Sequence, residues 1–240
     1  MSKADKRERQ RQNRELAKLE RERLIKRDRR MRTGRNLLFV LIPVVAIFVI
    51  LQVVNSGDSK KSSSNTPQRT FSSAPKMTID KAKNYSAKIE TTKGTIDVAL
   101  DAKTAPIATN NFVFLAKKGF YDKLCIDRVS KDFVIQGGSP KCDQQGGPGY
   151  TVAGEVPTDN YPEGSLAAAK SGSDPDGTMG SQFFIVTGSK GATLPNQYAR
   201  FGNVTTGLDV AKSIEALAPS TGDGKPSEKV TIKKITISES

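Results

Sequence analysis

The feature that most limits how this chain can fold is an uncharged stretch, residues 36–57, whose centre is almost wholly aliphatic. As a helix rising about 1.5 Å per residue, the aliphatic part at 37–54 spans roughly 27 Å, close to the thickness of a hydrocarbon core. Pro43 is compatible with this interpretation because membrane helices tolerate proline. The sequence therefore predicts a single transmembrane helix at residues 36–55.

Two other interpretations of this segment are a cleaved signal peptide and a buried helix of a soluble protein. A signal peptide is disfavoured because the basic region before it is too long and no Ala-x-Ala site follows. A buried helix is disfavoured by the highly charged flank. Because the Lys and Arg excess precedes the segment, we expect a single-pass protein of the cell membrane with a cytoplasmic N-terminus and an extracytoplasmic C-terminal bulk.

The charge of the chain is concentrated near its N-terminus. The formal net charge is +13, and residues 1–35 hold fifteen Lys or Arg against six Asp or Glu. This basic tail is either a solvated helix that sets the membrane topology or a contact site for anionic lipid or an acidic partner. The rest of the chain carries only a small positive excess, so we expect no nucleic-acid binding by the folded part.

A polar region, residues 56–85, follows the apolar segment and is rich in Ser, Lys, Asn and Pro. Few of its side chains are apolar, which is typical of a flexible linker. We therefore place the folded domain at residues 86–240, a length that suffices for one hydrophobic core.

The absence of histidine and the presence of only two cysteines restrict the chemistry of this domain. Nucleophile systems that pair Ser or Cys with His are excluded. Zinc is disfavoured because only Cys125 and Cys142 remain as soft ligands, and residues 174–177 lack the rest of a calcium loop. We expect neither a metal nor a cofactor. A disulfide between the cysteines is permitted outside the cytoplasm, and two free thiols are the alternative.

Alternating apolar and polar residues predict a mainly β domain. Ile89, Ile96 and Val98 alternate with polar residues on either side of a Thr-Lys-Gly turn, which is typical of a β-hairpin. Further strands are expected at residues 125–129, 132–136, 165–169, 183–187, 200–204 and 230–237.

Two helices accompany these strands. The first is expected to begin at a Thr104 cap, to carry Pro106 in its first turn and to end at Gly119; the second is expected at residues 208–217. Residues 137–154 read as a long loop because Gly, Pro, Gln and Asp dominate them. Many strands, long loops and only two helices predict a closed antiparallel β-barrel capped by the helices.

Two short strings in this domain carry most of the information about function. Residues 133–138 read FVIQGG, with Arg128 shortly before them, and residues 180–185 read GSQFFI. Each reads as a strand that places an apolar side chain next to a polar side chain that donates hydrogen bonds. Together they predict a shallow apolar pocket ringed by amide and guanidinium donors, which suits a proline-containing peptide.

From Ala87 to Ser238 the chain resembles the cyclophilin-type peptidyl-prolyl cis-trans isomerases. Several motifs carry the resemblance, and their order and spacing make it specific. They are Lys93-Gly94, Ala105-Pro106, Asn111-Phe112, Gly119-Phe120-Tyr121-Asp122, Arg128, Phe133, Gln136-Gly137-Gly138, Gly146-Gly147-Pro148-Gly149-Tyr150, Gly180-Ser181-Gln182-Phe183-Phe184 and Phe201-Gly202. The resemblance implies an eight-stranded antiparallel barrel closed by two helices, with an active groove on its outer face.

The resemblance also implies a role for individual residues. The catalytic positions of the family fall on Arg128, Phe133 and Gln136. Its substrate-binding positions fall on Val134, Gln182, Phe184, Leu194 and Tyr198, and on Ala169 or Lys170, where the backbone grips the peptide.

The sequence departs from the family pattern at four places. The family's Phe-His-Arg is replaced by Ile126-Asp127-Arg128, its groove Asn by Lys170, a frequent Trp by Thr193, and a His of the proline pocket by Tyr198. None of these changes removes the arginine, so the core of the mechanism is expected to survive.

Prolyl isomerisation suits a site without a metal or cofactor because it breaks no bond. The barrier to rotation about a peptide bond is about 18–20 kcal/mol. An X-Pro bond isomerises in roughly tens to hundreds of seconds without a catalyst. When the bond twists, the prolyl nitrogen becomes pyramidal and its lone pair accepts a hydrogen bond. Arg128 can donate to that lone pair, an interaction stronger in the transition state than in the ground state.

Three functional hypotheses follow. The first is a membrane-tethered, monomeric prolyl isomerase that assists the folding of exported proteins by acting on proline-containing segments of unfolded or flexible chains. The second is an anchored proline-peptide binding module or scaffold with little catalytic role, which Lys170 and Tyr198 keep open. The third makes the basic tail the functional part and the domain a passive scaffold.

Overall fold

The computed structural model describes residues 67–240. The predicted basic tail, residues 1–35, and the predicted transmembrane helix, residues 36–55, lie outside these residues. Among the residues that are described, no helix is both long enough and apolar enough to cross a membrane. The observed fold therefore concerns the C-terminal part of the chain.

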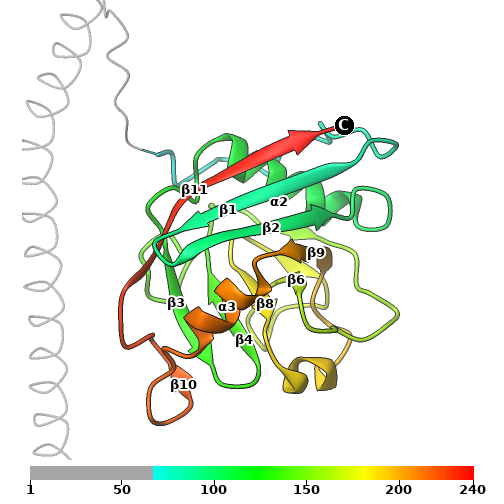
Figure 1. Cartoon of the computed structure of the whole chain (residues 1–240). Coiled ribbons are helices and arrows are strands. Elements are labelled where there is room, and N and C mark those ends of the chain that lie inside the picture. The colour runs from blue at the N-terminus through cyan, green and yellow to red at the C-terminus, as the bar shows by residue number, and fades with distance from the viewer. Residues whose placement is uncertain (1–66) are drawn as a thin grey trace, which may run out of the picture. The chain divides into compact units, whose positions relative to one another are not determined.

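Eight antiparallel strands form a closed barrel, which confirms the predicted eight-stranded antiparallel barrel (Figure 1). The strands follow the order β3-β11-β1-β2-β9-β6-β8-β4, and the pairing of β4 with β3 closes the ring. Their bounds are β1 Tyr85–Thr91, β2 Gly94–Leu100, β3 Cys125–Ser130, β4 Val134–Gly137, β6 Ser165–Ala168, β8 Phe183–Val186, β9 Arg200–Thr206 and β11 Val230–Glu239.

Three further strands of two residues each lie outside the ring. β5 (Val152–Ala153) pairs with β7 (Thr178–Met179) in a separate small sheet. β10 (Asp223–Gly224) pairs with the end of β3. Such short strands show no alternating pattern in the sequence and were not predicted from it.

The first hairpin forms where the alternating pattern predicts it. Ile89 of β1 pairs with Ile96 of β2, and both side chains are buried. The hydroxyl of Thr91 donates to the carbonyl of Gly94 at 2.7 Å and thereby closes the turn. Gly94 has a φ of +141°, and a Cβ there would lie 2.9 Å from the Val210 side chain. Glycine therefore allows both the turn and the close approach of the second helix.

Two α-helices pack against the barrel, α2 (Pro106–Lys117) and α3 (Leu208–Glu215), as Figure 1 shows. Gly119 has a φ of +68° just beyond α2, so glycine ends this helix as the sequence predicts. A short 3-10 helix, η1 (Ser189–Thr193), precedes the strand β9 and was not predicted.

The predicted cap of α2 is wrong. The N-cap position is Ala105 rather than Thr104, and it makes no side-chain hydrogen bond. The backbone N–H groups of Ile107 and Ala108 donate instead to the carboxylate of Glu155, at 2.8 and 3.1 Å. A remote carboxylate therefore satisfies the free donors of the first turn and complements the helix dipole.

The barrel interior is filled by an aromatic cluster. The ring centroid of Phe112 in α2 lies 5.2 Å from Tyr121, 5.7 Å from Phe183 and 5.1 Å from Phe201. All four side chains are fully buried. The cluster joins the helix to β8 and β9 and forms the centre of the core.

The packed unit begins before Ser86, the predicted first residue of the folded domain. A segment that we name the strap, residues 67–79, lies against the domain and forms hydrogen bonds and aromatic contacts with it. The ring of Phe71 packs edge-on against Phe114 of α2 with centroids 5.0 Å apart. A few anchoring side chains thus hold a segment whose overall composition is polar.

Candidate active site

A β-bulge in β3 directs Arg128 out of the barrel. Ile126 and Arg128 pair with consecutive residues of β4, so Asp127 is an extra residue in the ladder. A bulge of this kind shifts the alternation of side chains and can re-aim one of them. Ile126 and Val129 consequently both join the barrel core, whereas Arg128 lines a surface pocket.

Three hydrogen bonds fix the guanidinium of Arg128. Its Nε and Nη2 donate to the two carboxylate oxygens of Asp223, each at 2.9 Å, and its Nη1 donates to Oε1 of Gln136 at 3.1 Å. The guanidinium also lies 5.9 Å from the ring centroid of Phe133. Because a guanidinium carries five N–H donors, two remain available to a ligand.

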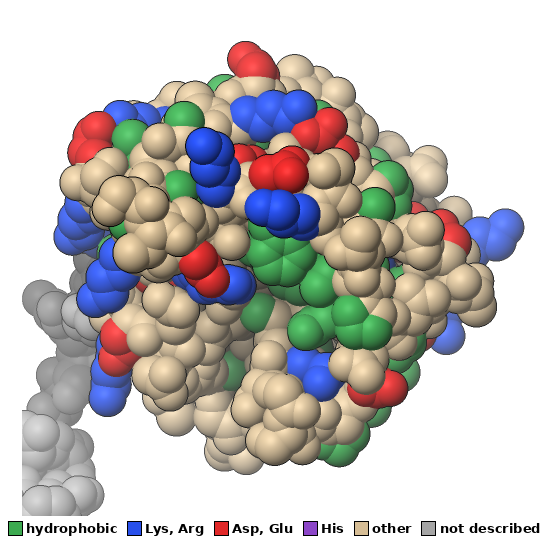
Figure 2. Space-filling view, turned by 90° about the horizontal axis from the view of Figure 1, so that it is seen from below, with side chains coloured by type: hydrophobic (Ala, Val, Ile, Leu, Met, Phe, Trp, Pro, Cys, Tyr) green, Lys and Arg blue, Asp and Glu red, His purple; other side chains and the backbone are tan. Residues whose placement is uncertain are grey.

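A pocket of about 180 Å³ lies beside this guanidinium. Figure 2 shows a face of the molecule on which hydrophobic side chains gather, bordered by basic and acidic side chains. The lining residues of the pocket are Arg128, Phe133, Val134, Gln136, Ala169, Lys170, Phe184, Leu194 and Tyr198. All nine were singled out from the sequence, and both Ala169 and Lys170 are among them. The structure thus brings together residues from distant parts of the chain.

The apolar side of the pocket is a cluster separate from the barrel core. Phe183 and Phe184 are consecutive in β8, and the first belongs to the core whereas the second belongs to this outer cluster. The alternation of side chains along a strand explains the division. The Phe184 ring packs edge-on against Tyr198, with centroids 5.6 Å apart. The pocket floor is therefore built on the outer surface of the barrel.

Tyr161 supports the wall of this pocket and was not predicted from the sequence. Its buried hydroxyl donates to the carbonyl of Tyr198 at 2.8 Å and accepts from the N–H of the same residue at 3.0 Å. Burial raises the pKa of Tyr161, so the hydroxyl stays neutral near neutral pH. This pair of bonds fixes the backbone that presents the Tyr198 ring.

A larger groove of about 760 Å³ adjoins the small pocket and shares Arg128, Gln136, Ala169 and Lys170 with it. Gln182, the one predicted site residue that does not line the small pocket, lines this groove. The predicted site residues therefore surround two adjoining cavities.

Lys170 lines both cavities. Its ammonium donates to the carbonyl of Asp174 at 3.0 Å and lies 5.6 Å from the ring centroid of Tyr198. Lys170 and Tyr198 are thus in contact through a cation–π interaction at the pocket rim.

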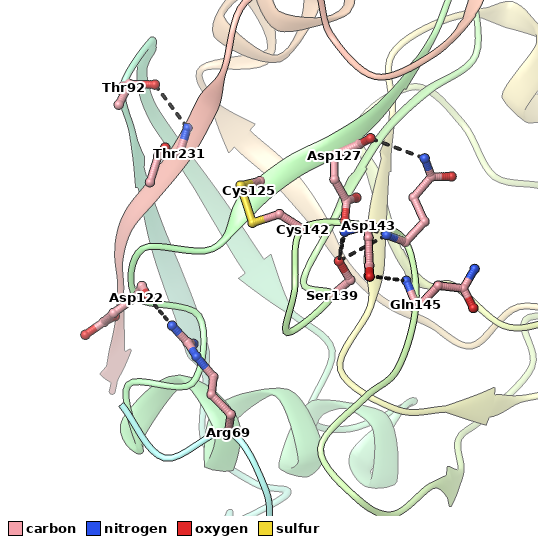
Figure 3. The surroundings of a disulfide bond; sticks show 11 residues. Arg69, Thr92, Asp122, Cys125, Asp127, Ser139, Cys142, Asp143, Gln145 and Thr231 are labelled. Carbon is pink, nitrogen blue, oxygen red and sulfur yellow. Dashed lines mark hydrogen bonds between the residues drawn. A yellow bond between two sulfur atoms is a disulfide. The ribbon is translucent and has the colours of Figure 1, made fainter. Parts of the chain in front are cut away.

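One wall of the groove is a segment that we name the wall loop, residues 138–151. A disulfide joins Cys142 of this loop to Cys125 of β3, so the bridge is present rather than two free thiols (Figure 3). The hydroxyl of Ser139 donates to a carboxylate oxygen of Asp127, as Figure 3 also shows. The N–H of Gln144 donates to the same oxygen. The wall loop is therefore anchored to the bulged strand by a covalent bond and by a buried carboxylate.

Asp127, the extra residue in the ladder of β3, is an acidic residue next to Arg128. Its side chain is buried, and burial raises the pKa of its carboxyl, although the hydrogen bonds from Ser139 and Gln144 act in the opposite direction. Its role in this fold is to hold the wall loop beside Arg128.

Three residues that shape the site gave no local signal in the sequence. Asp223 pairs with Arg128 across 95 positions, Gln144 accepts from Gln182 across 38, and Tyr161 bonds to Tyr198 across 37. Only the closure of the barrel brings these pairs together.

Within residues 67–240, no cluster of three or more His, Cys, Asp or Glu side chains is arranged to hold a metal ion.

Comparison with known proteins assigns the family. Residues 86–237 match the family model described as cyclophilin type peptidyl-prolyl cis-trans isomerase/CLD. The chain therefore belongs to the cyclophilin-type peptidyl-prolyl cis-trans isomerase family.

Bacterial proteins are among its relatives. The probable peptidyl-prolyl cis-trans isomerase B of Mycobacterium leprae is 34% identical over 183 residues, which are 68% of this chain and 60% of the relative. The peptidyl-prolyl cis-trans isomerase of Helicobacter pylori strain 26695 is 41% identical over 141 residues, which are 56% of this chain and 82% of the relative. The chain thus spans 54–60% of the length of the mycobacterial isomerase B relatives.

The fold is also similar to a solved structure from a eukaryote. A cyclophilin-type peptidyl-prolyl cis-trans isomerase of Cryptosporidium parvum aligns with a TM-score of 0.55 at 30% identity, over 65% of this chain and 98% of that chain. A second structure of that protein, in the presence of the dipeptide Ala-Pro, aligns with a TM-score of 0.54.

Proposed function

We propose that this chain is a peptidyl-prolyl cis-trans isomerase that accelerates rotation about X-Pro bonds of proteins outside the cytoplasm. The observation that carries the proposal is the small pocket, in which an apolar floor lies beside a guanidinium that retains free donors. Membership of the family supports it.

Substrate binding in this proposal is divided between the two cavities. The ring of proline enters the small pocket and is held by burial against Phe133, Phe184 and Leu194. The residues before or after proline lie in the larger groove, where Gln136 and Gln182 offer amide groups to the peptide backbone. The dipeptide in the Cryptosporidium parvum study has the same chemistry, an alanyl-proline unit.

Arg128 supplies the catalytic interaction in this mechanism. As the bond twists, conjugation is lost and the prolyl nitrogen becomes a hydrogen-bond acceptor. A free N–H of Arg128 donates to that nitrogen, and the bonds that Arg128 donates to Asp223 and Gln136 hold the guanidinium in position. Catalysis then comes from a preorganised donor aimed at charge that develops in the transition state.

The proposed place of action is the extracytoplasmic face of the cell membrane. The support is the uncharged segment at 36–57 and the basic residues before it, which favour a cytoplasmic N-terminus. The clients are proline-containing segments of exported proteins that are unfolded or flexible, and the enzyme acts as a monomer. Protease added outside intact cells should then cleave the C-terminal domain and spare an N-terminal tag, and the reverse pattern would contradict this topology.

The test of the catalytic proposal is the cis-to-trans rate of a proline tetrapeptide with the purified full chain. We expect a concentration-dependent acceleration over the uncatalysed rate, which has a time constant of roughly tens to hundreds of seconds. A folded protein that binds the tetrapeptide without accelerating its isomerisation would replace the enzyme by the second candidate, a proline-peptide binding module. The contact between Lys170 and Tyr198 at the pocket rim is the observation that favours this alternative.

A further inference from the structure

The strap, residues 67–79, lies outside the part of the chain that matches the family, which begins at residue 86. It nevertheless packs on the domain beside the wall loop. Figure 3 shows Arg69 of the strap reaching towards Asp122, with its guanidinium donating to the Asp122 carbonyl. The same guanidinium lies 5.6 Å from the ring centroid of Phe120. The strap is therefore attached by specific contacts at its N-terminal end.

The C-terminal end of the strap is attached to α2. The side-chain oxygen of Asn110 accepts from the N–H groups of Thr78 and Ile79, at 2.8 and 3.3 Å. The amide nitrogen of Asn110 donates to the carbonyl of Lys76 at 3.1 Å. One buried side chain of α2 thus fixes both the direction and the register of the strap.

The centre of the strap contacts the wall loop. The N–H of Phe71 donates to the carbonyl of Pro148 at 2.8 Å, and the Phe71 ring lies 6.4 Å from the ring of Tyr150. Gly149 has a φ of +93°, and a Cβ there would lie 2.7 Å from the carbonyl oxygen of Phe71. This close approach requires glycine. The strap backbone and the wall loop backbone are therefore in direct contact.

Two of the wall-loop residues that contact the strap, Gly149 and Tyr150, also line the groove. Their loop neighbours Gly146, Gly147 and Thr151 line it as well, and none of these five residues lines the small pocket. The hydroxyl of Tyr150 donates to Asn111 at 2.8 Å, and Asn111 donates to the carbonyl of Gly180 at 2.8 Å. The strap therefore supports the wall of one cavity and not the other.

A chain of hydrogen bonds leads from this wall to the catalytic guanidinium. Gln182 donates to the carbonyl of Gly146 at 2.9 Å and accepts from Gln136 at 3.1 Å, and Gln136 in turn accepts from Arg128 at 3.1 Å. A displacement of the wall loop would first disturb Gln182, which lines the larger groove. Arg128 keeps its two bonds to Asp223 in any case.

We propose that the strap is a positioning element of the isomerase, with Phe71 as its positioning residue, and that it shapes the groove for peptides long enough to extend beyond the proline pocket. This inference rests on the proposed function, because it takes the groove to be the substrate site. The strap then tunes affinity for extended segments of unfolded chains and leaves recognition of the proline ring unchanged.

The test uses the full chain with Phe71→Ala and two ligands of different length. For a proline tetrapeptide we expect kcat/KM and affinity to fall roughly tenfold, mainly through KM, because misplacement of a binding wall costs up to about 10²-fold. For the dipeptide Ala-Pro we expect the affinity to stay within about twofold. Phe71→Leu should restore most of the loss because it keeps an apolar side chain in the same place.

The matched control is Leu208→Ala, which removes a partly buried apolar side chain from α3, away from both cavities. It should leave the ratio of tetrapeptide to dipeptide affinity unchanged. The proposal is overturned if Phe71→Ala leaves tetrapeptide affinity intact, if it weakens both ligands equally, or if Leu208→Ala has the same selective effect. Should the wild-type chain bind peptides without catalysis, the proposed function fails, while the affinity ratio still decides the role of the strap.

Discussion

The two apolar clusters of this domain differ in their surroundings: the inner cluster is enclosed by the protein, whereas the outer cluster borders an open pocket. The inner cluster contains Phe183, which packs edge-on against Phe112 and Tyr121 inside the closed barrel. The outer cluster contains the next residue, Phe184, which packs against Tyr198 and borders an open pocket. Two neighbouring residues of one strand therefore lie on opposite sides of the sheet. One is part of the closed interior core, and the other is part of the wall of an open surface pocket.

The outer cluster lies outside the interior core, so we infer that it contributes less than the inner cluster to the stability of the barrel. An apolar surface that opens to water is unfavourable for solubility and commonly marks a ligand site. The inner cluster should therefore determine stability, whereas the outer cluster should determine peptide binding.

The largest expected effect is the contrast between Phe183→Ala and Phe184→Ala. The first should lower the free energy of unfolding by about 3–5 kcal/mol, the usual cost of emptying a core aromatic site. The second should cost less than half as much because water can enter from the pocket, but should weaken tetrapeptide binding by roughly tenfold or more. Urea unfolding and KM measure the two effects. The division between clusters fails if Phe184→Ala destabilises the fold as much as Phe183→Ala and leaves binding intact.

The second prediction concerns the covalent anchor of the outer wall. Replacing Cys142 by Ser should lower the free energy of unfolding by about 3 kcal/mol, because the disulfide closes a loop of intermediate length. The tetrapeptide affinity should fall as well, since the wall loop lines the groove. A reductant should destabilise the wild-type chain and leave the Cys142→Ser variant unaffected. A reductant effect of equal size on both would show that it acts elsewhere.

The third prediction separates positioning from stability. Asp223→Asn should lower kcat/KM by up to about tenfold through loss of the bidentate grip on Arg128, while KM changes little. Stability should change by less than about 1 kcal/mol because the pair is partly exposed. Asp159→Asn is the matched control, since both carboxylate oxygens of Asp159 accept from one nitrogen of Arg200, and neither residue lines the groove. Equal effects of the two variants on catalysis would argue against a positioning role.

The smallest predicted effect is a pH dependence from Asp127. Burial raises the pKa of this carboxyl above its ordinary value of 3.8, so the folded chain holds the proton more tightly than the unfolded chain. The contribution of this group to stability should therefore fall as pH rises from about 3.8 through the raised pKa. Urea unfolding of wild type and Asp127→Asn from pH 4 upwards should show a wild-type advantage that shrinks towards neutral pH. A wild-type advantage that grows with pH would mean that the hydrogen bonds from Ser139 and Gln144 outweigh burial.

The sequence predicts the barrel well because its signals are local. The alternation around Ile89 and Ile96 gives the first hairpin, and Gly119 ends α2 where a left-handed residue is needed. The pocket residues also follow from the sequence, since Phe133, Val134 and Gln136 lie within four positions and the family pattern supplies the others. Local periodicity therefore predicts the strands of the barrel, and motif spacing predicts the residues of the pocket.

Contacts between distant residues are what the sequence does not reveal. Glu155 caps α2 across 48 positions from Ile107, and Asp223 reaches Arg128 through a two-residue strand. The packing of the strap was not predicted for another reason. Its composition is mostly polar, and Phe71 is the single aromatic residue that anchors it. Each of these features depends on which parts of the chain the closed barrel brings together.

The most direct test of the central claim compares catalysis and binding in Arg128→Ala. If Arg128 stabilises the twisted bond, kcat/KM for the tetrapeptide should fall by about 10²- to 10³-fold, the usual cost of losing a preorganised transition-state donor. The affinity of the same variant for a non-reacting proline peptide should stay within about threefold, because the apolar pocket remains. A variant that keeps more than about a tenth of its activity, or that loses affinity as steeply as activity, would contradict the account.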